Sequence, residues 1–217
     1  MKLRRNAGRH SEVLSHRLPL SCLLLIASCA GVGIVASSDP LTKLNDAQVL
    51  FSEKNRPVPA EKLIDEAVAI YQNKGDAHGL GNAYREYGDF LRSQAVANWE
   101  SQYRRNGFFD RSITFDNRLD KAREFYGKAL EAYSGAVPKL TENGRFDALT
   151  NVYFNMAWVH LALDQKQQAC ESFERTLEAY DQNMQHNPNA KPTFTPGFNS
   201  LPEALQSARQ RAGCAAT

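Results

Sequence analysis

This sequence of 217 residues contains none of four common catalytic or metal-binding motifs. It lacks a G-x-x-x-x-G-K-[ST] phosphate loop, a G-x-S-x-G nucleophile turn, an H-E-x-x-H zinc motif and paired C-x-x-C motifs. Gly79-Leu80-Gly81 has no third glycine and follows no predicted strand, so it does not indicate a dinucleotide site. The sequence therefore gives no positive argument for an enzyme. We expect no catalytic residues, no metal, no cofactor and no small-molecule substrate.

The body of the chain also has no large excess of positive or of negative charge. The formal net charge is +2, but residues 1–29 hold five basic groups and one acid. Without them the chain has 21 basic and 23 acidic residues, a net charge of about −2. A near-neutral body has no strong attraction for a phosphate backbone, so nucleic acid is not an expected partner.

One long apolar run lies near the N-terminus, after a basic region. From Leu18 to Ala36 no residue is charged, which makes a run of about 19 residues. A basic region, an apolar run and then small residues is the order of a secretory signal. Three interpretations are open: an uncleaved anchor that uses the whole run, a soluble export signal cut after Ser38, or a lipoprotein signal.

The lipoprotein interpretation depends on Ile26-Ala27-Ser28-Cys29, which directly follows three leucines. This tetrapeptide resembles the lipobox of bacterial lipoproteins: an aliphatic residue, two small residues and the cysteine that receives lipid. Cys22 does not fit the same pattern, because Pro19 stands at the aliphatic position.

The lipobox resemblance implies a signal peptide over residues 1–28 and lipidation of Cys29. Residues 29–40 would then be a lipidated tether that attaches the protein to a membrane. By resemblance to proteobacterial lipoproteins, Ala30 after the lipidated cysteine favours the periplasmic leaflet of the outer membrane.

Cysteine is rare, with four residues in the chain. Cys22 would leave with the signal and Cys29 would take the lipid, so Cys170 and Cys214 remain. An even pair in an oxidising compartment predicts a disulfide between them. The soluble export signal would leave the same pair, so the count supports export without choosing the cleavage site.

The body of the chain contains a pattern that occurs three times. A small residue, a large residue, a small residue and a final residue of tyrosine follow at offsets 0, +4, +7 and +11, which is one face of a helix. The sets are Ala60, Ile64, Ala67, Tyr71; Ala122, Tyr126, Ala129, Tyr133; and Ala169, Phe173, Thr176, Tyr180. Upstream lies a second pattern at offsets 0, +3 and +7: Leu44, Ala47, Phe51; Tyr84, Tyr87, Leu91; and Tyr153, Met156, His160. Three helix pairs are therefore predicted.

This alternation resembles the tetratricopeptide repeat, in which alanine at a helix crossing lets two helices approach closely. The segments "NVYFNMAWVHLALDQKQQACESFERTLEAY" and "LDKAREFYGKALEAY" match that family well. The resemblance implies an all-α fold over residues 41–213, with three helix pairs in a right-handed superhelical array. The departures are Thr176, where alanine is usual, and His160, which we expect to be a core histidine.

The array has two predicted additions. Ser200 and Glu203 form a capping box, which predicts a helix over residues 201–213 that covers the last repeat. The middle pair carries an insertion, about residues 92–118, with five large aromatic side chains: Trp99, Tyr103, Phe108, Phe109 and Phe115. We expect the insertion to fold onto the array, either as a built-in ligand that fills the groove or as a partner-specific surface.

The tetratricopeptide resemblance implies a concave face, lined by the first helix of each pair, that binds a protein or peptide. The candidate partner-binding residues are Arg85, Asp89, Arg92, Phe154 and Trp158. For Trp158 the alternative is that neighbouring chain covers it.

The expected function is that of a non-catalytic envelope lipoprotein, acting as an interaction adaptor or assembly factor. The alternatives are an immunity or chaperone protein that sequesters one secreted toxin or enzyme, and an envelope enzyme.

Overall fold

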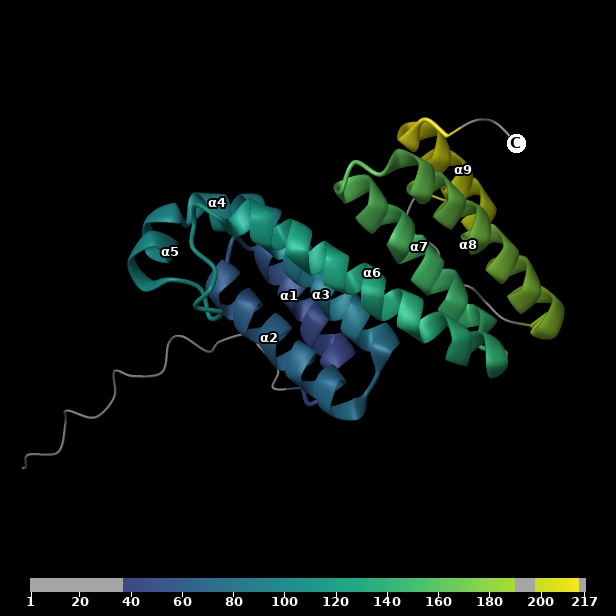
Figure 1. The fold of residues 1–217 in the computed structure, drawn as a ribbon, viewed down its shortest axis with the longest axis horizontal. Coiled ribbons are helices and arrows are strands. Elements are labelled where there is room, and N and C mark those ends of the chain that lie inside the picture. Colours follow the sequence, from purple (N-terminus) through teal and green to yellow (C-terminus); the bar gives the residue numbers. More distant parts are fainter. Residues whose placement is uncertain (1–36, 190–197, 215–217) are drawn as a thin grey trace, which may run out of the picture. The chain divides into compact units, whose positions relative to one another are not determined.

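The computed structural model describes residues 37–189 and 198–214, and every regular element in these two ranges is an α-helix (Figure 1). The signal segment, Cys29 and the tether up to residue 36 lie outside the described residues. The lipobox and the two other interpretations of the N-terminus therefore stay predictions. Among the helices that are described, none combines the length and the apolar character that crossing a bilayer requires.

The described helices comprise three long pairs, two short helices in the insertion and one helix near the C-terminus. The pairs are α1 (Pro40–Ser52) with α2 (Pro57–Lys74), α3 (Ala77–Arg92) with α6 (Arg118–Glu142), and α7 (Phe146–Ala162) with α8 (Lys166–His186). The others are α4 (Gln94–Asn98), α5 (Glu100–Asn106) and α9 (Leu201–Ala212). The insertion thus lies between the two helices of the middle pair.

Several helices begin at residues whose side chains satisfy free backbone N–H groups. The carboxylates of Asp39 and Asp76 accept hydrogen bonds from the N–H groups of Thr42 and Gly79, both at 2.9 Å. Ser200 caps α9 by accepting from the N–H of Glu203 at 3.3 Å, as its sequence predicted. These caps set the boundaries of α1, α3 and α9.

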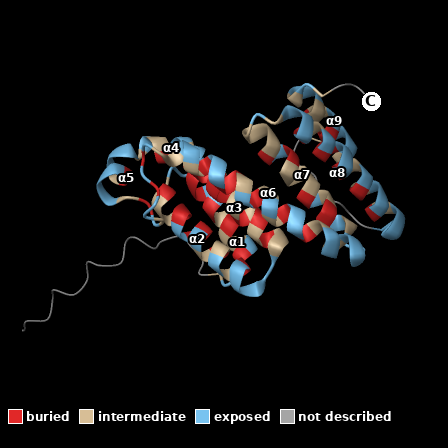
Figure 2. Cartoon of the chain, viewed as in Figure 1, coloured by how far each residue is buried: buried red, intermediate tan, exposed pale blue. Residues whose placement is uncertain are grey.

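Consecutive helices pack against each other along the chain. Besides the contacts within each pair, α2 contacts α3, α6 contacts α7 and α8 contacts α9. The first helices of the pairs also touch, since α3 contacts both α1 and α7. Figure 2 shows the buried residues gathered between these helices and the exposed ones on their outer sides.

The repeated face of the second helices forms much of the core. In α2 and α6 all eight pattern residues are buried, and the alanines at the crossings are fully inaccessible. In α8 Ala169, Phe173 and Thr176 are buried, whereas Tyr180 is half-buried. The pattern therefore located the core face of these helices.

For α7 the predicted buried face was wrong in register. Tyr153, Met156 and His160 are only half-buried, and Val152 and Val159 are buried instead. The cause is that α7 has neighbours on two sides. Its valines pack with Tyr126 and Tyr133 of α6, whereas Ala157 packs with Phe173, Leu205 and Ala208 of α8 and α9.

His160 is likewise not the core histidine that the sequence predicted. It is half-buried near the end of α7, and its Nδ1 atom lies 2.7 Å from Oε1 of Gln165. A polar partner in the turn before α8 therefore satisfies the ring.

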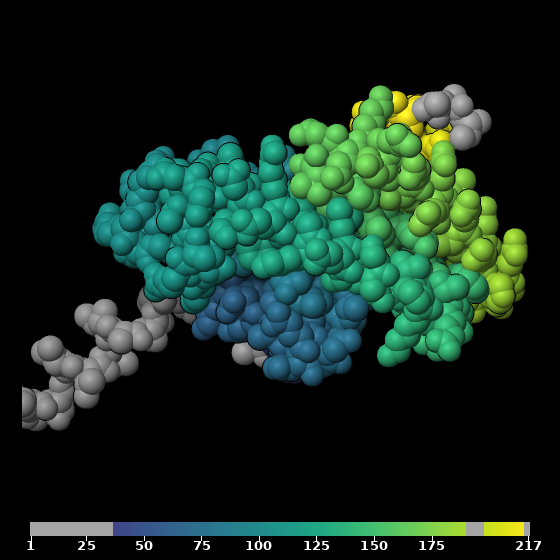
Figure 3. Space-filling model, in the orientation of Figure 1, coloured from purple at the N-terminus to yellow at the C-terminus, as the bar shows by residue number. Residues whose placement is uncertain are grey.

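The insertion folds against the helix pairs. The Tyr103 ring stacks on Phe108 with the centroids 4.1 Å apart and meets Phe90 of α3 edge-on at 6.5 Å. Phe115 is also buried, Trp99 is half-buried and Phe109 is 48% exposed. In the space-filling view α6, coloured teal, lies beside α7, coloured green (Figure 3).

Helix α9 covers the last pair. Leu205 and Ala208 are buried in one cluster with Ala157 of α7 and Phe173 of α8. A disulfide joins Cys170 of α8 to Cys214, two residues after the end of α9, with the Cα atoms 5.6 Å apart. The end of the chain is thus held at two points, one apolar and one covalent.

Candidate functional site

A row of polar side chains runs along one side of α3. Asn82, Arg85, Asp89 and Arg92 follow at offsets of three and four residues, which places them on one helix face. Arg85 and Asp89 are half-buried, whereas Arg92 is exposed. Three of the five predicted partner-binding residues therefore share this row.

The three charged residues of the row are linked to each other and to α6. The Arg85 guanidinium donates to Asp89 at 2.8 Å and to Glu86 at 3.1 Å. The Tyr126 hydroxyl donates to the other Asp89 oxygen at 2.6 Å, and the Arg92 guanidinium lies 5.8 Å from the centre of the Tyr126 ring. The positions of these side chains are therefore set by their neighbours.

Sequence reasoning missed Glu86, which lies beneath the row. It is 3% exposed, and its Oε1 atom has no hydrogen-bond partner among the described residues. Burial raises the pKa of this carboxyl to about 7, against the lowering effect of Arg85. The sequence did contain a signal for its burial, because Glu86 lies at helical spacing from two apolar residues, Ala83 and Phe90. Both of these are fully buried in the structure.

The other two predicted residues lie on α7 and belong to an aromatic cluster. Phe154 and Trp158 meet nearly at right angles with centroids 6.0 Å apart, and both contact the buried ring of Phe173. Phe154 is half-buried in the core cluster that α9 completes. Trp158 is 37% exposed, so the neighbouring chain covers it in part and leaves part of its ring at the surface.

A hydrogen bond joins the two helices that carry these groups. Asn155 of α7 donates to Oδ1 of Asn82 at 3.0 Å, and the Tyr133 hydroxyl of α6 donates to the same oxygen at 2.8 Å. Asn82 lies one turn before Arg85, and Asn155 lies one turn before Trp158. We name the combined area of Asn82, Arg85, Asp89, Arg92, Phe154, Asn155 and Trp158 the α3–α7 surface.

The α3–α7 surface combines amide, guanidinium, carboxylate and aromatic groups. Such a mixture suits recognition of a peptide or protein, because arginine and tryptophan concentrate binding energy at interfaces.

Within residues 37–189 and 198–214, no three side chains of His, Cys, Asp or Glu are grouped to hold a metal ion. Comparisons with protein-family models, with curated proteins and with solved structures gave no match to this chain.

Proposed function

We propose that this chain is a non-catalytic, lipid-anchored protein of the bacterial cell envelope that binds a protein or peptide partner on the α3–α7 surface. The observation that carries the proposal is the junction of the polar row on α3 with the partly exposed Trp158 on α7, at the Asn82–Asn155 hydrogen bond. Groups from two helix pairs thus contribute to one recognition surface. The protein would act as an adaptor or assembly factor.

The repeat-array part of the proposal is supported by the order of the contacts. Helix pairs follow one another, each pair packs on the next, and the first helices α1, α3 and α7 touch in sequence. Solenoid proteins build extended binding surfaces by stacking pairs in this way. We propose that the three pairs form a right-handed superhelical array like that of tetratricopeptide repeats, with the α3–α7 surface on its concave side.

Site-specific photo-crosslinking in cells tests the surface. A benzophenone amino acid at Trp158 or at Arg92 is expected to give discrete crosslinked species, because both side chains reach solvent on the α3–α7 surface. Leu119 of α6 is the matched control, since it is 49% exposed and lies outside this surface. Crosslinks at position 119 without any at 158 or 92 would contradict the proposal. A single abundant product would favour the sequestering alternative, and several products would favour an adaptor.

The lipid anchor has its own test. Cys29→Ser is expected to abolish labelling with an alkyne fatty acid and to leave unprocessed precursor, because the thiol is the lipidated group of the lipobox. Cys22→Ser is the control, since Cys22 lies in the same apolar run but has proline at the aliphatic position. Normal labelling and maturation of the Cys29→Ser protein would refute the lipoprotein interpretation.

A further inference from the structure

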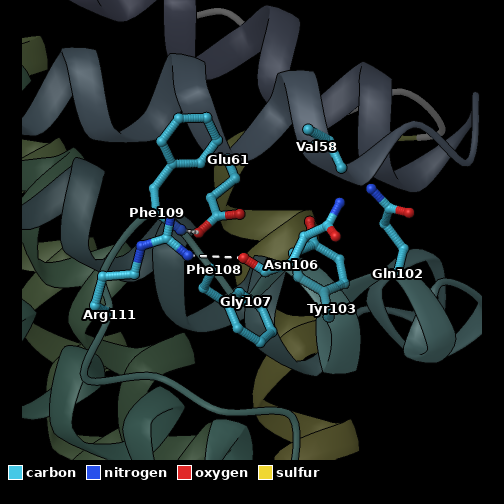
Figure 4. Close-up of a pocket in the computed structure, with 9 residues that line it drawn as sticks. All are labelled: Val58, Glu61, Gln102, Tyr103, Asn106, Gly107, Phe108, Phe109 and Arg111. Atoms are coloured by element: carbon cyan, nitrogen blue, oxygen red, sulfur yellow. Dashed lines mark hydrogen bonds between the residues drawn. The ribbon is translucent and has the colours of Figure 1, made fainter.

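A cavity of about 190 Å³ lies between α2 and the insertion, away from the α3–α7 surface (Figure 4). Its walls include Val58 and Glu61 of α2, Tyr103 and Asn106 of α5, and Phe108 and Arg111 of the following loop. At about 30 Å³ per water molecule, this volume suits a small ligand or the end of one long side chain.

The chemistry of the cavity centres on Glu61, a carboxylate that is 1% exposed. Its Oε1 atom accepts hydrogen bonds from the N–H of Phe109 at 2.6 Å and from the hydroxyl of Tyr87 at 3.2 Å. In the described part of the chain Oε2 accepts no hydrogen bond, and no lysine or arginine lies within ion-pair distance. Oε1 of Glu61 thus accepts two hydrogen bonds, whereas Oε2 accepts none of good geometry within the described residues.

A buried carboxylate without a cation is unfavourable as the anion. Burial raises the pKa of Glu61 to about 7, although the Phe109 N–H group acts in the opposite direction. Near neutral pH the group can take up a proton or hold a positive ligand, and either outcome removes the cost of the isolated charge. The cavity beside it gives a positive ligand room to approach.

The other residues that line the cavity limit the kind of positive ligand that fits there. The Tyr103 hydroxyl is buried, forms no hydrogen bond of good geometry within the described residues, and acts on Glu61 by lowering the pKa of that carboxyl, so it serves Glu61 rather than a ligand. Val58 and Phe108 supply apolar surface for an alkyl chain. An ammonium group supplies a positive charge and hydrogen-bond donors for the free Glu61 oxygen, whereas a metal ion would need further ligands of the carboxylate or imidazole type.

We propose that the cavity binds a primary alkyl ammonium group, with Glu61 as its counter-ion and hydrogen-bond acceptor. The ammonium group belongs either to a free amine or to a lysine side chain of a protein. Arg111 opposes binding, because its guanidinium also lines the cavity, where Nη1 donates to the Asn106 carbonyl at 2.7 Å. Arg111 is exposed, so water and salt weaken its repulsion more than they weaken the attraction of Glu61. This site is independent of the function proposed for the α3–α7 surface.

Calorimetric titration of the full chain in detergent tests the site, with n-butylamine as the probe and n-butanol as its uncharged counterpart. We expect n-butylamine to bind and n-butanol to bind at least tenfold more weakly. The affinity for n-butylamine is expected to rise about tenfold from pH 6 to pH 8, because a carboxyl with a pKa near 7 becomes ionised over that interval. Equal binding of the two probes, or binding that does not change with pH, would overturn the proposal.

Variants with opposite expected effects sharpen the test. Glu61→Gln should abolish binding of n-butylamine, and Arg111→Ala should strengthen it severalfold by removing a like charge. Glu171→Gln removes an exposed acid of α8, a helix that does not line the cavity, and is expected to change the affinity less than twofold. If Glu61→Gln does not fold, Tyr103→Phe serves instead, with a severalfold loss expected at neutral pH because the pKa of Glu61 rises. Unchanged affinity in the folded Glu61→Gln or Tyr103→Phe protein would refute the assignment.

A second probe distinguishes the two sources of the ammonium group. Nα-acetyl-lysine methylamide carries a lysine side chain within a peptide-like backbone. Binding comparable to that of n-butylamine would assign the cavity to a lysine of a protein. Binding of n-butylamine alone would assign it to a free amine. Failure of both probes would refute the ammonium site and leave the crosslinking test of the α3–α7 surface unaffected.

Discussion

Replacing Gly81 by alanine is expected to lower the free energy of unfolding by about 2 kcal/mol. Gly81 lies inside α3, where a Cβ atom would stand 2.5 Å from Cδ1 and 2.6 Å from Cε1 of Tyr133. Alanine gains about 1 kcal/mol over glycine in a helix interior, but the overlap with the ring exceeds this gain. The net change is therefore destabilising.

The Tyr133 ring cannot easily move aside. It is fully buried in a core cluster with Tyr126, Val152 and Val159, and its hydroxyl is held by Asn82 at 2.8 Å. A second glycine of α3 shows the same arrangement, since a Cβ atom at Gly88 would stand 2.6 Å from the Tyr126 ring. The two glycines let α3 and α6 approach closely enough to bury both tyrosines.

Gly135→Ala in α6 is the matched control. Gly135 is exposed, and apart from its own helical turn no atom of the described residues lies within 4 Å of the position of its Cβ atom. The free energy of unfolding should rise by about 0.5–1 kcal/mol, from helix propensity alone. Denaturant titration of both variants measures the two effects. In a Tyr133→Leu background, which has no aromatic ring at this position, the cost of Gly81→Ala should shrink. Equal changes in the two glycine variants would contradict the close packing of α3 on α6.

The repeated pattern of small and large residues predicted most of the long helices, because its positions are those that a packed helix buries. Ala60, Ala67, Ala122 and Ala129 are fully inaccessible where the pattern placed alanine at a helix crossing. The short helices α4 and α5 were not predicted, since five and seven residues are too few to show a periodic face. The sequence did indicate, through its aromatic residues, that the insertion would pack.

The register of α7 shows where a repeat pattern misleads. A single periodic face implies one buried side, but α7 buries Val152 against α6 and Ala157 against α8 and α9. Two buried sides broaden the apolar stripe, so that the pattern residues Tyr153 and His160 fall at its margins. Sequence periodicity alone does not separate these two arrangements.

The candidate site was predicted as a set of separate side chains. The sequence placed Arg85, Asp89 and Arg92 on one helix face, but their mutual contacts and the hydroxyl of Tyr126 depend on the packing of α6. Glu61 and Glu86 were not among the predicted site residues, because a charged residue in an amphipathic helix is usually exposed. The burial of Glu61 depends on tertiary contacts with the insertion, which periodicity along the chain does not show.

Loss of the Cys170–Cys214 disulfide is expected to reduce the stability of the C-terminal part by up to about 4 kcal/mol. The bond closes a sequence separation of 44 residues, which restricts the unfolded chain strongly in the chain-entropy account. Without it, α9 is held by a small apolar contact, mainly Leu205 and Ala208, and by the Arg209–Glu174 ion pair at 3.2 Å. The effect should therefore be largest in α9.

Hydrogen exchange measured on the protein before and after reduction locates that effect. Amides of α9 are expected to lose protection first, whereas α1, α2 and α3 should keep theirs, because α9 packs mainly on α7 and α8. Cys170→Ala and Cys214→Ala, each made alone, should reproduce the change without a reductant. Thiol counting on the denatured, non-reduced protein is the control for the bond itself. Two reactive thiols at positions 170 and 214, or simultaneous loss of protection in α9 and α1, would contradict a disulfide that clamps α9 onto α8.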